Sequence, residues 1–125
     1  MDYSKYDLKK SEVEPKLKEG VKVLSFYQIG CPPCDMIKPE LVKLVEKNKD
    51  KMELFLVRIN RDGKHDEERR WAAESGVSAT PTTFIYKDGK IVNTIVGYKP
   101  LSVLEEEMSK LEMNCACSET GCATK

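Results

Sequence analysis

Stretches of β-branched and aromatic residues alternate with charged segments of helical spacing along this 125-residue chain. The segments 21–28 and 52–60 have the composition of buried strands. The segment 82–97 predicts two more strands, joined at the turn Lys87-Asp88-Gly89-Lys90. Asp-Gly is a strong hairpin signal, because both central residues of a type I′ turn need positive φ.

Four helices are predicted around these strands. Ser11 with Glu14 forms a capping-box pattern, and Pro15 suits a first turn, so a short helix is expected over about 11–19. Apolar residues recur at helical spacing from Cys34 to about Lys49, around an internal proline. Further helices are expected over about 65–75 and from Pro100 to about Leu111.

The order of these elements predicts an α/β fold. Strands that alternate with helices pair in parallel through crossovers, and the hairpin adds an antiparallel pair. We expect a mixed sheet of four or five strands with helices on both faces. One domain is expected over residues 1–111, followed by a flexible cysteine-bearing tail over 112–125.

Composition narrows the possible functions. Basic and acidic residues number 21 each, so the basic footprint of a nucleic-acid binder is absent. No apolar run has the length of a membrane span, and the N-terminal residues are polar, unlike a signal peptide. We therefore expect a cytoplasmic monomer that binds neither nucleic acid nor membrane. Five cysteines in such a setting suggest catalysis or metal binding more than structural disulfides.

Cys31 and Cys34 form a C-P-P-C motif between a predicted strand and a predicted helix. A sulfur at a helix N-terminus meets free N–H groups and the positive end of the dipole, which favour the reactive thiolate. Such sites lower a cysteine pKa from about 8.5 toward about 7 or below. Cys34, one turn further on, could then attack a mixed disulfide and release the product. The pattern predicts a two-step thiol–disulfide exchange site.

The residues around the pair modify this expectation. Pro32 and Pro33 lack an N–H, so the first backbone donors that can reach Cys31 belong to Cys34 and the residues after it. Asp35 adds a negative charge beside the site, which should raise the pKa of the cysteines.

A C-x-x-C motif also has the spacing of a zinc half-site or a structural disulfide. A zinc ribbon needs a second pair about 15–20 residues further on. No such pair occurs before Cys115, so the redox interpretation is favoured.

The motifs F-Y-x-x-G-C-P-P-C-x-x-I-K-P, A-x-x-x-G-V-x-x-x-P-T and K-D-G-K, followed by Gly97, resemble the thioredoxin family in order and spacing over about residues 11–111. The resemblance implies the thioredoxin fold, Cys31 as the attacking sulfur and a cis peptide bond between Thr80 and Pro81. It also implies a substrate groove; the residues expected there are Thr80, Pro81, Gly97, Pro32 and Pro33. Protein disulfides would be the substrates, a flavoprotein of the thioredoxin reductase type the electron donor, and no cofactor is expected.

The chain departs from the family pattern at three places. Gly30 stands where a tryptophan is usual, and Thr80 where many members have isoleucine. Ser25 replaces the buried aspartate that transfers protons, and a serine carries protons poorly. Glu53 and Arg58, on the neighbouring strand, are the alternative groups considered for that role.

The remaining candidates have competing interpretations. Cys115, Cys117 and Cys122 fit an exposed disordered tail, a metal-binding cluster or an auxiliary redox pair. His65 and the run 66–70 are expected to lie on a solvated helix face, and Trp71 to pack against the domain. Besides a disulfide reductase, the sequence therefore leaves open a metal or metalloid carrier that uses the tail and a non-catalytic adaptor that uses the Thr80–Pro81 groove.

Overall fold

The computed structural model describes residues 3–48 and 50–117, with the side chains of residues 4 and 110–117 left out. Its strands are β1 (Val21–Tyr27), β2 (Met52–Arg58), β3 (Thr82–Lys87) and β4 (Lys90–Val96). Its helices are α1 (Lys10–Val13), α2 (Pro32–Lys47), α3 (Asp66–Glu74) and α4 (Leu101–Cys117), with 3₁₀ turns η1 (Ser4–Tyr6) and η2 (Glu14–Lys18).

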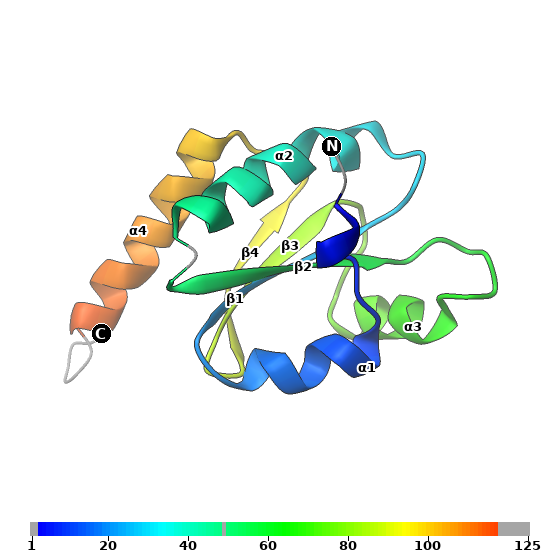
Figure 1. Cartoon of the computed structure of the whole chain (residues 1–125), viewed down its shortest axis with the longest axis horizontal. Coiled ribbons are helices and arrows are strands. Elements are labelled where there is room, and N and C mark those ends of the chain that lie inside the picture. The colour runs from blue at the N-terminus through cyan, green and yellow to red at the C-terminus, as the bar shows by residue number, and fades with distance from the viewer. Residues whose placement is uncertain (1–2, 49, 118–125) are drawn as a thin grey trace.

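The strands form one mixed sheet in the order β2-β1-β3-β4 (Figure 1). Strand β1 pairs in parallel with β2 and antiparallel with β3, and β3 continues into β4 as a hairpin. The turn of that hairpin has Asp88 and Gly89 at φ 52° and 89°, as the Asp-Gly signal predicts. The sheet thus confirms the predicted mixed topology, with four strands. Asp7, outside these strands, forms an isolated parallel bridge to Leu56 of β2.

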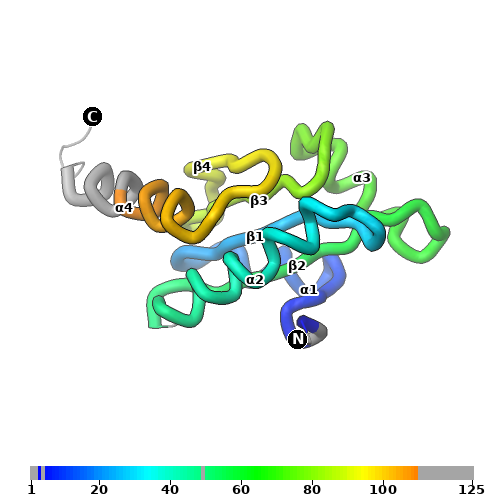
Figure 2. Tube along the Cα trace, turned by 90° about the horizontal axis from the view of Figure 1, so that it is seen from above, coloured from blue at the N-terminus to red at the C-terminus, as the bar shows by residue number. Residues whose placement is uncertain are grey.

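Helices cover both faces of the sheet, as predicted. Figure 1 shows α2 and α4 on one face and α1 and α3 on the other, and Figure 2 shows α4 beside α2. Because successive side chains of a strand point to opposite faces, each buried strand supplies both cores. In β1, Val23 and Tyr27 pack toward α2, whereas Leu24 and Phe26 belong to the second core.

Two expectations about the helices need correction. The run 66–70 is not wholly solvated: Glu68 is buried, because its carboxylate accepts the Lys10 N–H at 2.8 Å and lies 3.7 Å from the Lys9 amine. Helix α4 continues to Cys117 instead of ending near Leu111. The division of the chain into a domain over 1–111 and a tail over 112–125 stays a prediction.

None of the helices in the described part of the chain combines the length and the apolar character needed to cross a membrane.

Candidate active site

Cys31 occupies the N-cap of α2, four residues after β1 ends at Tyr27. Its Sγ accepts the backbone N–H of Cys34 at 3.3 Å. The two cysteines are joined as a disulfide, with their Cα atoms 5.2 Å apart. Cys34 is fully buried in the core shared by β1 and α2, whereas Cys31 is partly exposed. Of the two residues, only Cys31 has exposed surface.

The two prolines of the motif lie at the first positions of α2 and are exposed. Neither Pro32 nor Pro33 can donate a hydrogen bond, so the N–H of Cys34 is the first one available to the Cys31 sulfur. The 3.3 Å bond from Cys34 confirms this sequence-based expectation.

Three residues that the resemblance placed in a substrate groove do lie together on one side of Cys31. The Thr80–Pro81 peptide bond is cis, as expected. The Thr80 hydroxyl lies 3.6 Å and its carbonyl oxygen 3.7 Å from the Cys31 sulfur. Gly97 donates its N–H to the Pro81 carbonyl at 2.8 Å. We call Thr80, Pro81 and Gly97 the proline flank.

A pair of hydroxyl groups lies at the place where the resemblance implies a buried aspartate. Ser25 of β1 and Thr83 of β3 are cross-strand partners, and neither has exposed surface. The Thr83 hydroxyl donates to the Ser25 Oγ at 3.1 Å. This pairing satisfies polar groups that would be costly to bury alone, and it puts no titratable group at this point of the sheet.

The aromatic residue of β1 nearest the site is held by charged neighbours. Tyr27 donates its hydroxyl to the Asp7 carboxylate, and the Lys38 amine lies 3.9 Å from the centre of its ring. Burial, together with the hydrogen bond and the charge of Asp7, raises the pKa of Tyr27 above its ordinary value. Lys38 also lies 3.9 Å from Asp35, which offsets part of the negative charge that the sequence placed beside the cysteines.

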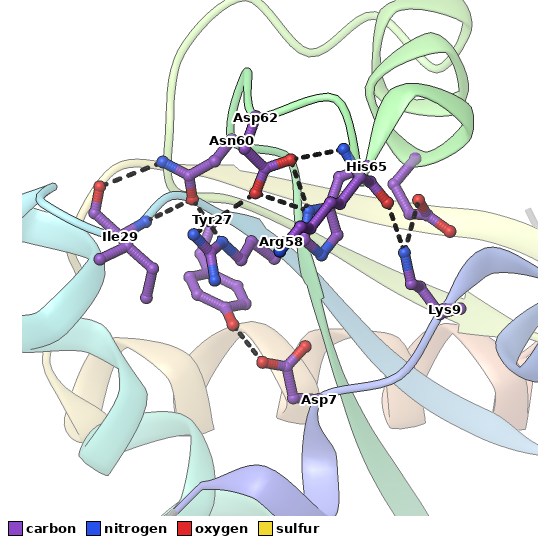
Figure 3. Close-up of polar contacts among 10 residues, drawn as sticks. Asp7, Lys9, Tyr27, Ile29, Arg58, Asn60, Asp62 and His65 are labelled. Atoms are coloured by element: carbon purple, nitrogen blue, oxygen red, sulfur yellow. Dashed lines mark hydrogen bonds and ion pairs between the residues drawn. The ribbon is translucent and has the colours of Figure 1, made fainter.

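A second group of residues ties the loop that leads from β1 to Cys31 to the segment that follows β2 (Figure 3). The Asn60 Oδ1 accepts the Ile29 N–H at 2.8 Å, and the Asn60 Nδ2 donates to the Ile29 carbonyl at 3.3 Å. The same Oδ1 accepts the Nε–H of Arg58 at 2.9 Å. We call Ile29, Gly30 and Asn60 the asparagine flank.

An ionic cluster of Arg58, Asp62 and His65 contacts the asparagine flank through the bond from Arg58 to Asn60. Arg58 lies 3.5 Å from the Asp62 carboxylate, which also bonds the His65 ring nitrogen at 3.0 Å. The hydrogen bonds from His65 and from the Lys64 backbone lower the pKa of Asp62 to about 2. His65 thus belongs to this cluster and precedes α3, instead of lying on its solvated face.

The asparagine flank was missed at the sequence level, although a signal for it exists. Parallel strands end at the same edge of a sheet, so the residues that follow β1 lie beside those that follow β2. Asn60 comes two residues after β2, as Ile29 comes two residues after β1. A polar side chain at that position is well placed to bond the neighbouring loop.

The other candidates are engaged by partners other than the cysteines, or their side chains lie outside the described part of the chain. Glu53 lies at the opposite end of β2 and pairs with Lys22, and Arg58 is engaged by Asn60 and Asp62. Trp71 is buried edge-to-face against Phe26, as the packing interpretation expects. The side chains of Cys115 and Cys117, and all of Cys122, lie outside the described part of the chain. No group of three or more potential metal ligands occurs among the side chains that the structure does describe.

The fold and the site together define a thioredoxin-fold protein with a C-x-x-C disulfide at the start of a helix. The family model for thioredoxin matches residues 5–110, and the chain belongs to the thioredoxin family.

Individual relatives agree with this assignment. The chain is 36% identical to the thioredoxin of Bacillus subtilis over 92 residues, which cover 74% of this chain and 83% of that protein. It is 31% identical to the thioredoxin of Listeria monocytogenes over 97 residues, covering 78% and 88% of the two chains. Among solved structures, oxidised mitochondrial thioredoxin 3 of Saccharomyces cerevisiae superposes with a TM-score of 0.67 at 28% identity, covering 83% of this chain and 92% of that one.

Proposed function

We propose that the chain reduces disulfides in protein substrates by dithiol–disulfide exchange, with Cys31 as the nucleophile and Cys34 as the resolving thiol. The observation that carries the proposal is the unequal exposure of two bonded sulfurs. Cys31 is partly exposed at the N-cap of α2, and Cys34 is fully buried behind it. A substrate can therefore reach the first sulfur but not the second.

The first step transfers the substrate to the protein. In the reduced chain the Cys31 thiolate attacks one sulfur of the substrate disulfide, the substrate S–S bond breaks, and the released thiolate takes up a proton. The Cys34 N–H and the Thr80 hydroxyl, which contact the Cys31 sulfur at 3.3 and 3.6 Å, support the thiolate before the attack.

The second step releases the product. The Cys34 thiol loses its proton, attacks the Cys31 sulfur of the mixed disulfide and displaces the second substrate thiol, which is then protonated. The substrate has gained two electrons and two protons, and the chain is left with the Cys31–Cys34 disulfide. Thiol–disulfide exchange of this kind needs no cofactor.

The proline flank supports binding of an extended substrate segment. We infer that a substrate strand pairs with the backbone near Thr80 and Pro81, beside Gly97, by main-chain hydrogen bonds of the β-augmentation type. Pro32 and Pro33, which are exposed at the start of α2, would border the same groove.

The family supports a proposal for the electron donor, and the sequence supports one for the location. We propose that a flavoprotein of the thioredoxin reductase type returns electrons to the Cys31–Cys34 disulfide, and that the chain works in the cytoplasm as a monomer. Metal binding by Cys115, Cys117 and Cys122 stays a sequence-based hypothesis, since their side chains are not described.

Insulin reduction with dithiothreitol as the donor tests the proposal. The full chain should accelerate precipitation of the insulin B chain, and Cys31→Ser should abolish the acceleration. Cys34→Ser should stall after the first step and support no turnover. Equal activity of Cys31→Ser and the wild type would contradict the proposal and point to the tail cysteines.

Truncation tests the proposed division of the chain. Residue 111 lies inside α4, but the last buried side chains described on that helix, Leu104 and Met108, precede it. A chain ending at Leu111 should therefore fold and keep its insulin-reducing activity. Loss of activity with retained folding would show that the tail belongs to the reductase.

A further inference from the structure

An apolar side chain, that of Ile29, is exposed just before the proposed nucleophile, and Asn60 bonds the backbone of the same residue. Ile29 is 53% exposed and lies two residues before Cys31. Figure 3 shows the Asn60 amide facing the Ile29 backbone, while the Ile29 side chain points away from that amide. The side chain is therefore free to contact another molecule although its backbone is fixed.

The Asn60 side chain fixes the Ile29 backbone by hydrogen bonds at two points. The Asn60 amide makes one bond to the N–H and one to the carbonyl of the same residue, at 2.8 and 3.3 Å. The third bond, from Arg58 at 2.9 Å, occupies the same Oδ1 and fixes which way the amide is turned. Arg58 is in turn oriented by Asp62.

Gly30, the residue after Ile29, explains why these hydrogen bonds matter. Gly30 has φ 86°, a conformation that side-chain-bearing residues rarely adopt, and its Cβ position has open space around it. A glycine in an exposed turn leaves the backbone free to rearrange. The two bonds from the Asn60 amide restrain the residue directly before this glycine.

The surroundings of the nucleophile add further exposed apolar surface. Large apolar side chains are more than half exposed at only three described positions: Ile29, Met36 and Val96. Ile29 precedes Cys31, Met36 lies two residues after Cys34, and Val96 adjoins Gly97 of the proline flank. Ile29 and Met36 thus come from the segments on either side of the cysteine pair, and Val96 comes from the end of β4, next to the residue that bonds Pro81.

We propose that Ile29 is a specificity-determining residue that favours disulfides with an apolar side chain next to the attacked cysteine, and that Asn60 is a positioning residue that acts through it. The inference rests on the proposed reductase function. Ile29 contacts the substrate side chain, and Asn60 keeps Ile29 in place while Cys31 attacks.

The test uses two synthetic peptides, each closed by one disulfide and identical except for leucine or serine directly before the first cysteine. The prereduced full chain reacts with each peptide in single turnover, and the rate measured with Cys31→Ser is subtracted to remove the contribution of tail thiols. The wild type should react about fivefold faster with the leucine peptide. That ratio is smaller than the factor of about ten or more for a methylene in a closed pocket, because Ile29 stays partly exposed.

Ile29→Thr keeps the β-branch but replaces apolar surface by a hydroxyl, and should bring the ratio close to one. The matched control is Ile91→Thr, where the isoleucine is 43% exposed and lies at the hairpin end of β4, at the opposite end of the strand from Val96 and Gly97. This control should keep the fivefold ratio. Reaction with hydroxyethyl disulfide, which has no flanking side chain, should change by less than twofold in both variants.

Asn60→Ala should also lower the ratio, and the double variant with Ile29→Thr should lower it no further, because Asn60 acts through Ile29. Asn60→Asp keeps the two bonds that the Oδ1 accepts, but it loses the bond donated to the Ile29 carbonyl and places a second acceptor there. It should therefore lower the ratio in part, and it serves as the positioning test if Asn60→Ala does not fold. A wild type that reduces both peptides equally, or an Ile29→Thr variant with an unchanged ratio, overturns the role of Ile29. Additive effects of the two substitutions overturn the role of Asn60. A wild type that reduces neither peptide instead overturns the reductase function, and this inference with it.

Discussion

The two flanks of Cys31 are built by different means. In the proline flank the backbone itself is close to the sulfur, and Gly97 ties it to β4 through one N–H to the Pro81 carbonyl. In the asparagine flank a single side chain, Asn60, holds a loop that has little packing of its own. The first flank therefore lies directly beyond the ends of β3 and β4, joined by this bond, and its residues should matter for stability as well as reactivity. The second flank is an exposed loop held by one side chain. Its residues should therefore affect substrate choice and have a smaller effect on folding stability.

The largest expected effect concerns the buried hydroxyl pair that anchors the proline flank to β1. Thr83→Val removes the donor to Ser25, both residues having no exposed surface, and leaves a buried hydroxyl without that partner. We expect a loss of about 1–3 kcal/mol in the free energy of unfolding, measured by urea denaturation. The double variant Ser25→Ala/Thr83→Val should regain most of it. Simple addition of two losses would show that the pair is not coupled.

Gly97→Ala separates the two roles of the proline flank. Gly97 has φ 82°, so alanine should cost about 1 kcal/mol of unfolding free energy and displace the bond to Pro81. Gly63→Ala is the matched control, because Gly63 has φ 77° and equally open space around its Cβ position. Both variants should lose similar stability, and only Gly97→Ala should reduce insulin-reducing activity, by about threefold. Equal activity in the two variants would remove Gly97 from the site.

Thr80→Val tests the contact of the proline flank with the nucleophile. The hydroxyl 3.6 Å from the Cys31 sulfur can donate to a thiolate, and valine cannot. Alkylation of the reduced chain by iodoacetamide at pH 7, followed at Cys31 by peptide mapping, should slow by about threefold. Thr94→Val, at an exposed position of β4, should leave the rate unchanged.

The smallest expected effect belongs to the ionic cluster behind the asparagine flank. The pKa of Asp62 is lowered to about 2 from an ordinary value of 3.8. A lowered pKa stabilises the fold above the ordinary value, and that contribution is lost as the pH falls from about 4 toward 2. The wild type should therefore exceed Asp62→Asn slightly in urea midpoint at pH 5, and the difference should vanish near pH 2. A difference that persists at pH 2 would assign the effect to something other than the carboxylate charge.

The difference between the flanks also explains what the sequence could predict. The strand composition and the Asp-Gly turn predicted a mixed sheet of four or five strands, since these signals act over a few neighbouring residues. The sheet that the structure describes has four. The proline flank was expected from a family resemblance, and the structure brings Thr80, Pro81 and Gly97 together as implied. The two prolines predicted that Cys34 gives the first N–H to Cys31, because that conclusion depends only on which residues have a donor.

What the sequence did not predict depends on contacts between distant segments. Glu68 was expected in solvent, but its burial depends on Lys9 and Lys10, which lie almost 60 residues earlier in the chain. Asn60 meets Ile29 only because β1 and β2 are adjacent and parallel. Lys38 was not singled out, since its contact with the Tyr27 ring requires knowing that α2 crosses that face of the sheet.

Trapping of the mixed disulfide tests the central claim, that the exposed sulfur attacks and the buried one resolves. Reduced Cys34→Ser is mixed with a peptide disulfide, and the adduct is mapped by proteolysis and mass spectrometry. We predict a stable adduct on Cys31 in Cys34→Ser, no adduct at position 34 in Cys31→Ser, and rapid release from the wild type. An adduct on Cys34 in Cys31→Ser, formed as fast as the one on Cys31, would contradict the account.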